Sequence, residues 1–61
     1  MTRRTVHPTA FDHKSKMRLI EHGAAWVDTG LRSPLRPGMT LLEATDGYGK
    51  WWPLTHVEKA S

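Results

Sequence analysis

The pattern of hydrophobic and polar positions predicts one helix followed by several short strands. Between residues 10 and 22, apolar side chains recur at spacings of three and four, the period of a helix with one buried face. Lys14 and Arg18 share the opposite face of this helix. A short strand over Met17 to Glu21 is the competing interpretation. The expected buried stripe is Ala10, His13, Met17 and Ile20, flanked by Phe11 and Leu19.

Local signals set the expected ends of this helix. Thr9 is a suitable N-cap, with Asp12 three residues later, and Gly23 is a favoured residue just after a helix. Before it, Pro8 disfavours helical backbone at the preceding residue. Residues 1–8 are therefore expected to form a basic flexible arm, and residues 9–61 a single small domain.

After Gly23, glycines and prolines separate short segments typical of strands. Asp46 to Gly49 has the composition of a hairpin turn, and Ser33 to Gly38 that of a constrained loop. The predicted fold is α+β: one N-terminal helix packed on a small, curled, barrel-like antiparallel sheet of three or four strands. The strand candidates are Ala24 to Thr29, Met39 to Thr45, Lys50 to Trp52 and, after the interruption at Pro53, Leu54 to Lys59.

Composition argues against several functional classes. The chain has 61 residues and no Cys, which excludes disulfides, thiolate zinc sites and thiol nucleophiles. No two of the four His have the helical spacing of a metal pair, and no nucleophile motif surrounds a Ser. We therefore expect a protein that is not an enzyme, with no catalytic residues, no metal, no cofactor and no small-molecule substrate.

Charge is concentrated in the first third of the chain. Residues 1–18 hold five Lys or Arg and one Asp, whereas the other 43 residues hold four Lys or Arg and five acids. Such an asymmetry is typical of a segment that contacts phosphates or an acidic protein surface, although a basic tail can also serve solubility alone. Asn and Gln are absent, so the bidentate amide contact to adenine is unavailable.

The two adjacent tryptophans cannot both enter one core. Successive side chains of a strand point to opposite faces of the sheet, and Pro53 keeps Trp52 out of a helix. One ring of the pair Trp51 and Trp52 therefore belongs to the core. The other either covers the back of the sheet or is exposed for binding beside Tyr48 and Lys50.

The segment PGMTLLEATDGYGKWWPLTHVEK, Pro37 to Lys59, resembles small barrels of the Tudor and PWWP type. Its ending, Trp52 to Val57, is also similar to the close of Src-homology-type barrels, in which a short helical turn after Pro precedes the last strand. The resemblance implies a module that binds peptides, often methylated ones, or nucleic acid. It also implies a binding surface at Tyr48, Trp51 and Trp52.

A second segment, SKMRLIEHGAAWVDTGLRSPLRPGMTLLE, Ser15 to Glu43, resembles a different family. This is the small RNA-binding domain of a ribosomal small-subunit protein, some tRNA synthetases and pseudouridine synthases. The shared features are a basic helix ending in Leu-Ile-x-x-Gly and a Pro-Gly-x-x-Leu strand. This resemblance implies RNA contacts at Lys14, Lys16 and Arg18.

The leading hypothesis is a binding module for nucleic acid, RNA or single strands in preference to duplexes. The alternative is a small protein-binding adaptor, inhibitor or regulator, of the kind that phages and plasmids encode, and a homodimer stays open. No apolar run is long enough for a membrane span, so we expect no membrane contact and a cytoplasmic location. The candidate binding residues are Arg3, Arg4, Lys14, Lys16, Arg18, Tyr48, Lys50, Trp51 and Trp52.

Overall fold

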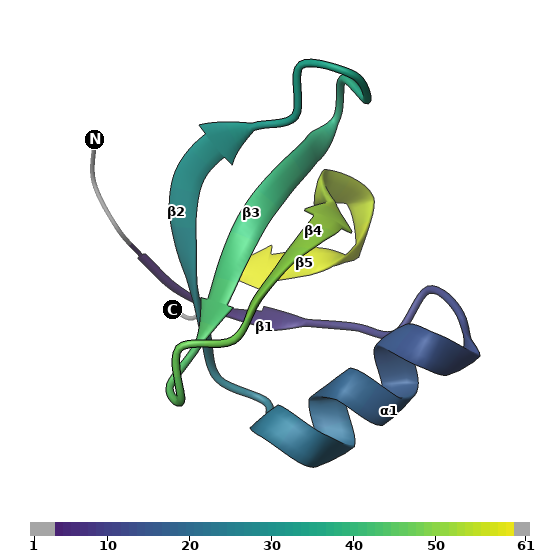
Figure 1. Ribbon diagram of the computed structural model, residues 1–61, viewed down its shortest axis with the longest axis vertical. Coiled ribbons are helices and arrows are strands. Elements are labelled where there is room, and N and C mark those ends of the chain that lie inside the picture. Colours follow the sequence, from purple (N-terminus) through teal and green to yellow (C-terminus); the bar gives the residue numbers. More distant parts are fainter. Residues whose placement is uncertain (1–3, 60–61) are drawn as a thin grey trace.

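The described part of the chain contains five strands, one α-helix and one short 3₁₀ helix. The computed structural model describes residues 4–59. The strands form one antiparallel sheet with the order β4-β3-β2-β1-β5 (Figure 1). In chain order the elements are β1 (Arg4–Pro8), α1 (His13–His22), β2 (Trp26–Arg32), β3 (Met39–Ala44), β4 (Gly49–Pro53), the 3₁₀ helix η1 (Leu54–His56) and β5 (Val57–Lys59).

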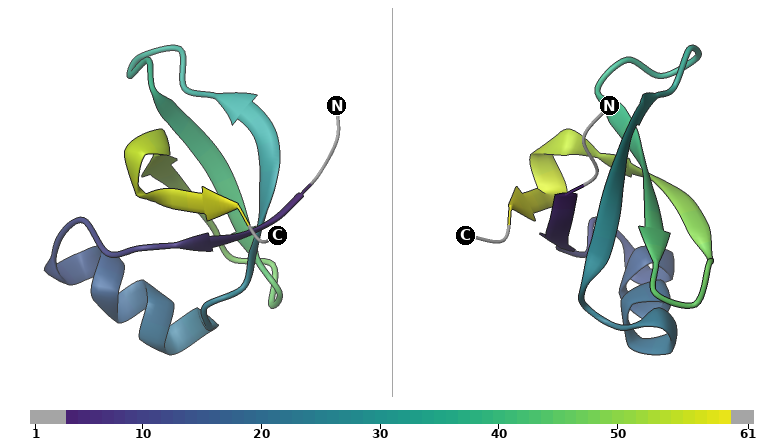
Figure 2. Two further views of the ribbon diagram at one scale, coloured as in Figure 1. Left: turned by 180° about the vertical axis from the view of Figure 1, so that it is seen from behind. Right: turned by 90° about the vertical axis from the view of Figure 1, so that its left-hand side faces the viewer.

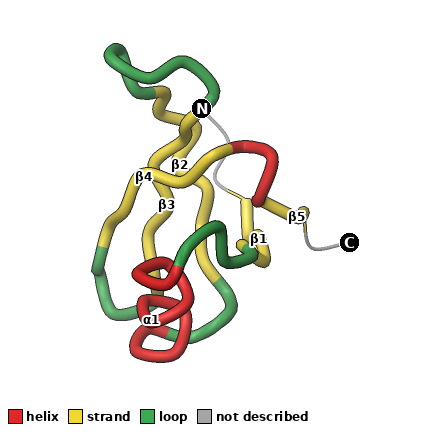
Figure 3. The backbone as a smooth tube through the Cα atoms, turned by 90° about the vertical axis from the view of Figure 1, so that its right-hand side faces the viewer, coloured by secondary structure: helices red, strands yellow, loops and turns green. Residues whose placement is uncertain are grey.

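The α+β class is confirmed, and the sheet curls into a half-barrel. β1 and β5 cross at a steep angle to β2 and β3, which the views in Figure 2 show from two further sides. The sheet has five strands, against the three or four expected. Helix α1 lies at the end of the sheet that holds the β3–β4 turn, far from the loop over residues 33–38 (Figure 3). Within residues 4–59, no helix is long and apolar enough to cross a membrane.

The additional strand is β1, in the segment that the sequence predicted to be an arm. Residues 4–8 pair with β2 on one side and with β5 on the other. Val6 is 1% exposed and Pro8 is buried, so this segment lies within the sheet. The sequence of this segment gives little indication of a strand, because it has one buried apolar position among polar neighbours. It forms a strand because it pairs with neighbouring strands on both sides. Residues 1–3, with Arg3, lie outside the described residues.

Helix α1 begins three residues later than predicted. Its N-cap is Asp12, whose Oδ1 accepts a hydrogen bond from the Ser15 backbone N–H at 2.7 Å. In return, the Ser15 hydroxyl oxygen accepts from the N–H groups of Asp12 and Phe11, at 2.9 and 2.8 Å. This capping box satisfies backbone donors that the helix itself leaves unpaired. The end of the helix at Gly23 is confirmed.

The predicted buried stripe of this helix is wrong. Met17 is 38% exposed and Ile20 66% exposed. The helix instead turns Ser15, which is fully buried, and the half-buried Leu19 and His22 towards the sheet. Ser15 is buried where its hydroxyl completes the capping box. The buried face of α1 therefore contains a polar residue, and a search for apolar residues does not identify it. The other two stripe residues, Ala10 and His13, are exposed.

An aromatic cluster fills the inside of the half-barrel. The Trp26 and Trp52 rings lie 5.8 Å apart between centroids, and the Phe11 ring meets Trp52 edge-on at 5.0 Å. Both buried indole N–H groups have partners: Trp26 donates to the Gly23 carbonyl at 2.7 Å, and Trp52 to the Thr9 carbonyl at 3.0 Å. The core therefore ties the segments before and after α1 to the sheet.

Strand β2 continues past the expected stop because a bulge interrupts its pairing. The register with β3 shifts between Asp28 and Arg32, and Gly30 has a φ of 81°. The Asp28 carboxylate accepts hydrogen bonds from the Gly30 N–H at 3.0 Å and from the buried Thr40 hydroxyl at 2.6 Å. Gly30 therefore bends the strand without ending it.

Candidate functional site

Trp51 and Trp52 lie on opposite faces of β4, as their adjacency requires. Trp52 has no exposed surface and belongs to the core, whereas Trp51 is 37% exposed on the outer face. The prediction that one of the two rings is a core residue is confirmed. Of these two rings, only that of Trp51 can be reached by a partner.

Apart from Glu43, which is paired with Gly49 near the turn, the outer face of the β3–β4 hairpin is apolar around Trp51. Trp51 is paired with Leu41, and Pro53 with Met39. Directly opposed residues of an antiparallel pair share a face, so these four side chains form one row, called here the apolar row. It is separated from the core by the thickness of the sheet.

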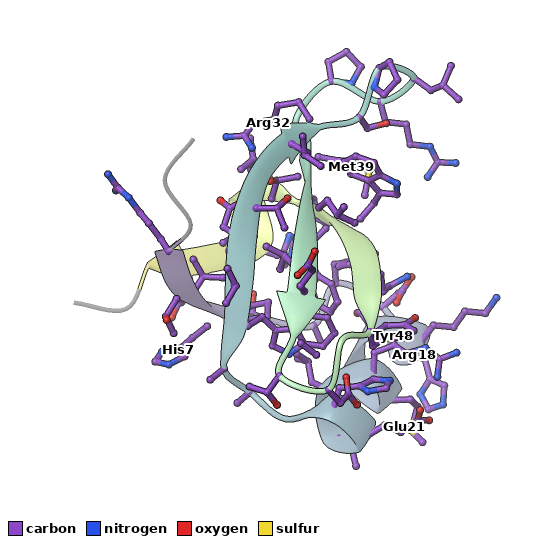
Figure 4. The ribbon with its side chains drawn as sticks, turned by 60° about the vertical axis from the view of Figure 1, so that its left-hand side comes forward. His7, Arg18, Glu21, Arg32, Met39 and Tyr48 are labelled. Carbon is purple, nitrogen blue, oxygen red and sulfur yellow. The ribbon has the colours of Figure 1, made fainter. Side chains whose placement is uncertain are left out.

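Tyr48 lies on the helix side of the hairpin turn. Its ring stacks on the His22 ring, with centroids 4.1 Å apart and planes 4° from parallel. The Arg18 guanidinium carbon lies 5.8 Å from the centre of the Tyr48 ring. Figure 4 shows Arg18 of α1 beside Tyr48, with Glu21 on the same helix. Tyr48 therefore contacts the helix and is only half exposed to a partner.

Lys50 extends from the inner side of β4 towards the start of α1. Its Nζ lies 5.9 Å from the centre of the Phe11 ring. The pKa of Asp12 is lowered, first by the hydrogen bond from the Ser15 backbone and also by the positive charges of Lys50 and Lys14. Both ammonium groups therefore act on the same carboxylate, although they come from different elements.

Three cations consequently gather where α1 meets β4: Lys14, Arg18 and Lys50, called here the basic cluster. Lys14 and Arg18 are one helical turn apart on one face of α1, and Lys50 approaches from the sheet. Glu21 accepts hydrogen bonds from Arg18 at 3.2 Å through both carboxylate oxygens, which offsets part of this charge.

The remaining predicted cations lie apart from this cluster. Lys16 is exposed and is two positions from both Lys14 and Arg18, so it points to another side of the helix. Arg4 is exposed on β1. The exposed tryptophan does not lie beside Tyr48 and Lys50, as one alternative expected, since only Trp51 lies on the outer face.

Sequence reasoning missed His22 and Asp46. The His22 Nδ1 lies 2.5 Å from an Asp46 carboxylate oxygen, and this contact joins α1 to the hairpin turn. The pKa of Asp46 is lowered, first by the hydrogen bond with His22 and then by the Tyr48 backbone N–H. The two residues are far apart in the sequence, and no local pattern connects them. They hold the Tyr48 ring between Arg18 and the core.

Cations beside aromatic faces are suited to anionic groups such as phosphates or carboxylates. In the comparisons, no protein family, no curated protein and no solved structure matches this chain. The two resemblances noted in the sequence therefore stay predictions, and the geometry of the surface carries the functional argument.

Proposed function

We propose that this chain is a non-enzymatic, cytoplasmic nucleic-acid-binding module that prefers RNA or single strands to duplexes. The observation that carries the proposal is that Lys14, Arg18 and Lys50, from a helix and a strand more than thirty residues apart, lie where α1 meets the β3–β4 hairpin: Lys14 and Lys50 both act on Asp12, and Arg18 lies over Tyr48. Three cations on one side of so small a protein favour a ligand with regularly repeated negative charge. Binding is then driven by phosphate contacts and by counterion release.

The preference for single strands follows from the position of Trp51. Lys50 and Trp51 are neighbours on β4, with Lys50 on the inner side and Trp51 on the outer face. A strand that crosses the edge of β4 can place phosphates at the basic cluster and an unpaired base on the exposed ring. Stacking of this kind requires bases that are not already stacked in a duplex.

The small-barrel resemblance supports a binding role at the same hairpin. The short helical turn that it implies after Pro53 corresponds to η1, which precedes the final strand β5. The sheet order β4-β3-β2-β1-β5 is also compatible with a Src-homology-type barrel. In the proposal, Lys16 and Arg4 add charge at a distance from the cluster.

The test is fluorescence anisotropy with labelled 12-nucleotide dT and rU strands over a series of salt concentrations. With three phosphates neutralised, the slope of log K against log salt is expected to be roughly −2. Lys14→Ser and Lys50→Ser should each reduce its magnitude by roughly 0.7, equally for both sequences. Trp51→Ala should cost about 1–3 kcal/mol of binding.

Arg36→Ser is the matched control because it removes one positive charge from an exposed loop residue at the far end of the sheet. Its slope should stay close to that of the unaltered protein. Equal losses in Arg36→Ser and Lys50→Ser, or a slope near zero, would contradict the proposal.

The apolar row favours a second candidate function, a protein-binding adaptor or inhibitor. Trp51 is 37% exposed, and Leu35 in the loop over residues 33–38 is 90% exposed. Affinity capture from a lysate, with and without nuclease, separates the two candidates. A partner retained after nuclease treatment supports the adaptor, and nuclease-sensitive absorbance at 260 nm supports the nucleic-acid module. Light scattering after size exclusion tests for a homodimer.

A further inference from the structure

The outer strand β4 has an unpaired side, because it is hydrogen-bonded only to β3. Two backbone hydrogen bonds flank their ladder: Ala44 N–H donates to the Tyr48 carbonyl, and Leu54 N–H to the Gly38 carbonyl, both at 2.8 Å. In an antiparallel pair, hydrogen-bonded and non-hydrogen-bonded positions alternate. These two bonds therefore determine which backbone groups of β4 point towards β3.

The alternation that starts at these flanking bonds places Lys50 and Trp52 at hydrogen-bonded positions. It places Gly49 and Trp51 at non-hydrogen-bonded positions. The N–H and C=O groups of Gly49 and Trp51 therefore point away from β3. Both residues are exposed. Such a row of free donors and acceptors is a template for an added strand.

The two sides of this edge differ in chemistry. On the inner side, the charges of Lys50 and Lys14 both act on Asp12, and Arg18 of the same helix lies over the Tyr48 ring. On the outer side, Trp51 lies beside Leu41 in the apolar row. Side chains of an added strand alternate between these two sides.

We propose that the free edge of β4 binds an extended peptide segment in which acidic and apolar residues alternate. Acidic side chains of the added strand face the basic cluster, and apolar side chains cover Trp51. The backbone of the segment pairs with the N–H and C=O groups of Gly49 and Trp51. This surface shares the basic cluster and Trp51 with the proposed nucleic-acid site, and it differs from that site because it uses the backbone of β4 and does not require phosphate contacts.

Charge and geometry favour this occupant over two others. A second copy pairing through β4 about a two-fold axis would bring its own basic cluster to the same side of the joined sheet, where like charges repel. A sugar-phosphate backbone has no amide N–H groups and cannot continue the ladder. An acidic, alternating peptide satisfies both the ladder and the charges.

The test is amide hydrogen exchange followed by NMR on the full chain. The probe is an acetylated, amidated eight-residue peptide that alternates Glu and Val. The Gly49 and Trp51 amides should exchange quickly in the free protein and about tenfold more slowly with the probe bound. A peptide alternating Lys and Val should not protect them. A block peptide, four Glu followed by four Val, should bind more weakly because it cannot separate charge and apolar groups onto two sides.

Two variants at Gly49 separate backbone pairing from charge attraction. Gly49→Pro removes an N–H that points away from β3, a position at which an edge strand tolerates proline. Gly49→Ala is the control, because a Cβ there would lie 3.7 Å from Leu41 Cδ1 and 3.8 Å from the Leu42 carbonyl oxygen, both ordinary contacts. Gly49→Pro should weaken probe binding by roughly fivefold to tenfold, the weight of one hydrogen bond, whereas Gly49→Ala should bind as the unaltered protein does.

Several outcomes would overturn the proposal. These are unchanged exchange of the Gly49 and Trp51 amides with the probe, equal binding of the block peptide, or protection caused by dimer formation in the absence of peptide. Protection of the same two amides by dT strands would assign the edge to nucleic acid. If Gly49→Pro does not fold, the exchange data on the unaltered protein decide. If Gly49→Pro still binds oligonucleotides, the proposed function holds even where this inference fails.

Discussion

The two faces of the β3–β4 hairpin are built from similar residues and differ in exposure. On the inner face, Trp52 is fully buried, and its indole N–H is bonded to the Thr9 carbonyl. On the outer face, Trp51 is partly exposed and is paired with Leu41. The same residue type, one position apart, is thus either buried in the core or partly exposed, according to the face on which it lies.

This difference means that stability and binding can be changed separately in a very small protein. A domain of this size has a core worth roughly 3–5 kcal/mol, so few side chains can be removed from the inner face without unfolding. Trp51, which is 37% exposed on the outer face, lies outside this core.

The largest effect is expected from the tryptophan pair. Trp52→Ala should cost about 3–5 kcal/mol and leave the chain unfolded, because it empties the centre of the aromatic core. Trp51→Ala should cost less than about 1 kcal/mol, the weight of a cross-strand pair. Urea denaturation followed by circular dichroism measures both. Comparable losses of stability would show that the two faces are not distinct in this way.

A smaller effect is expected at the start of α1. Ser15→Ala removes the buried hydroxyl that accepts hydrogen bonds from two backbone N–H groups, and should cost about 1–2 kcal/mol. Binding of single strands by the fraction that stays folded should be unchanged. Thr55→Ala, at an exposed position, is the control and should be neutral. A Ser15→Ala protein as stable as the control would mean that the capping box does not hold the helix.

The smallest effect concerns the contact between α1 and the hairpin turn. The pKa of Asp46 lies below its ordinary value of 3.8, chiefly through His22, so folding favours the ionised carboxylate. The stability that this contributes is present above about pH 4 and is lost as the pH falls through the lowered pKa. Melting temperatures from pH 7 to pH 2 should therefore fall less steeply for Asp46→Asn, with part of the slope left by Asp12, whose pKa is also lowered. An identical acid profile in Asp46→Asn would contradict this role.

The hairpin and the ends of β3 could be predicted because their signals are local. Met39 begins a strand after Pro37-Gly38, and Asp46-Gly47 marks the turn. The helix start was missed because the capping box is formed by Asp12 and Ser15, where the common pattern ends in Glu or Gln. β1 was missed because its strand character depends on pairing with residues 20 to 24 positions away in β2 and 49 to 53 positions away in β5.

The candidate surface was predictable only in its components. Lys14 and Arg18 were assigned to one helix face from their spacing, but the position of Lys50 beside them depends on where α1 packs. The division between Trp51 and Trp52 followed from strand geometry alone. Which of them is buried depends on the direction in which the sheet curls, and local sequence does not specify this.

The central claim is that Trp51 alone among the three tryptophans meets a ligand, and the indole N–H signals in an NMR titration test it directly. The Trp26 and Trp52 indoles are hydrogen-bonded inside the core and should exchange slowly and keep their positions when a dT strand is added. The Trp51 signal should exchange quickly and shift with the ligand. A shift confined to Trp26 or Trp52, or no shift at Trp51 at saturating ligand, would contradict the account.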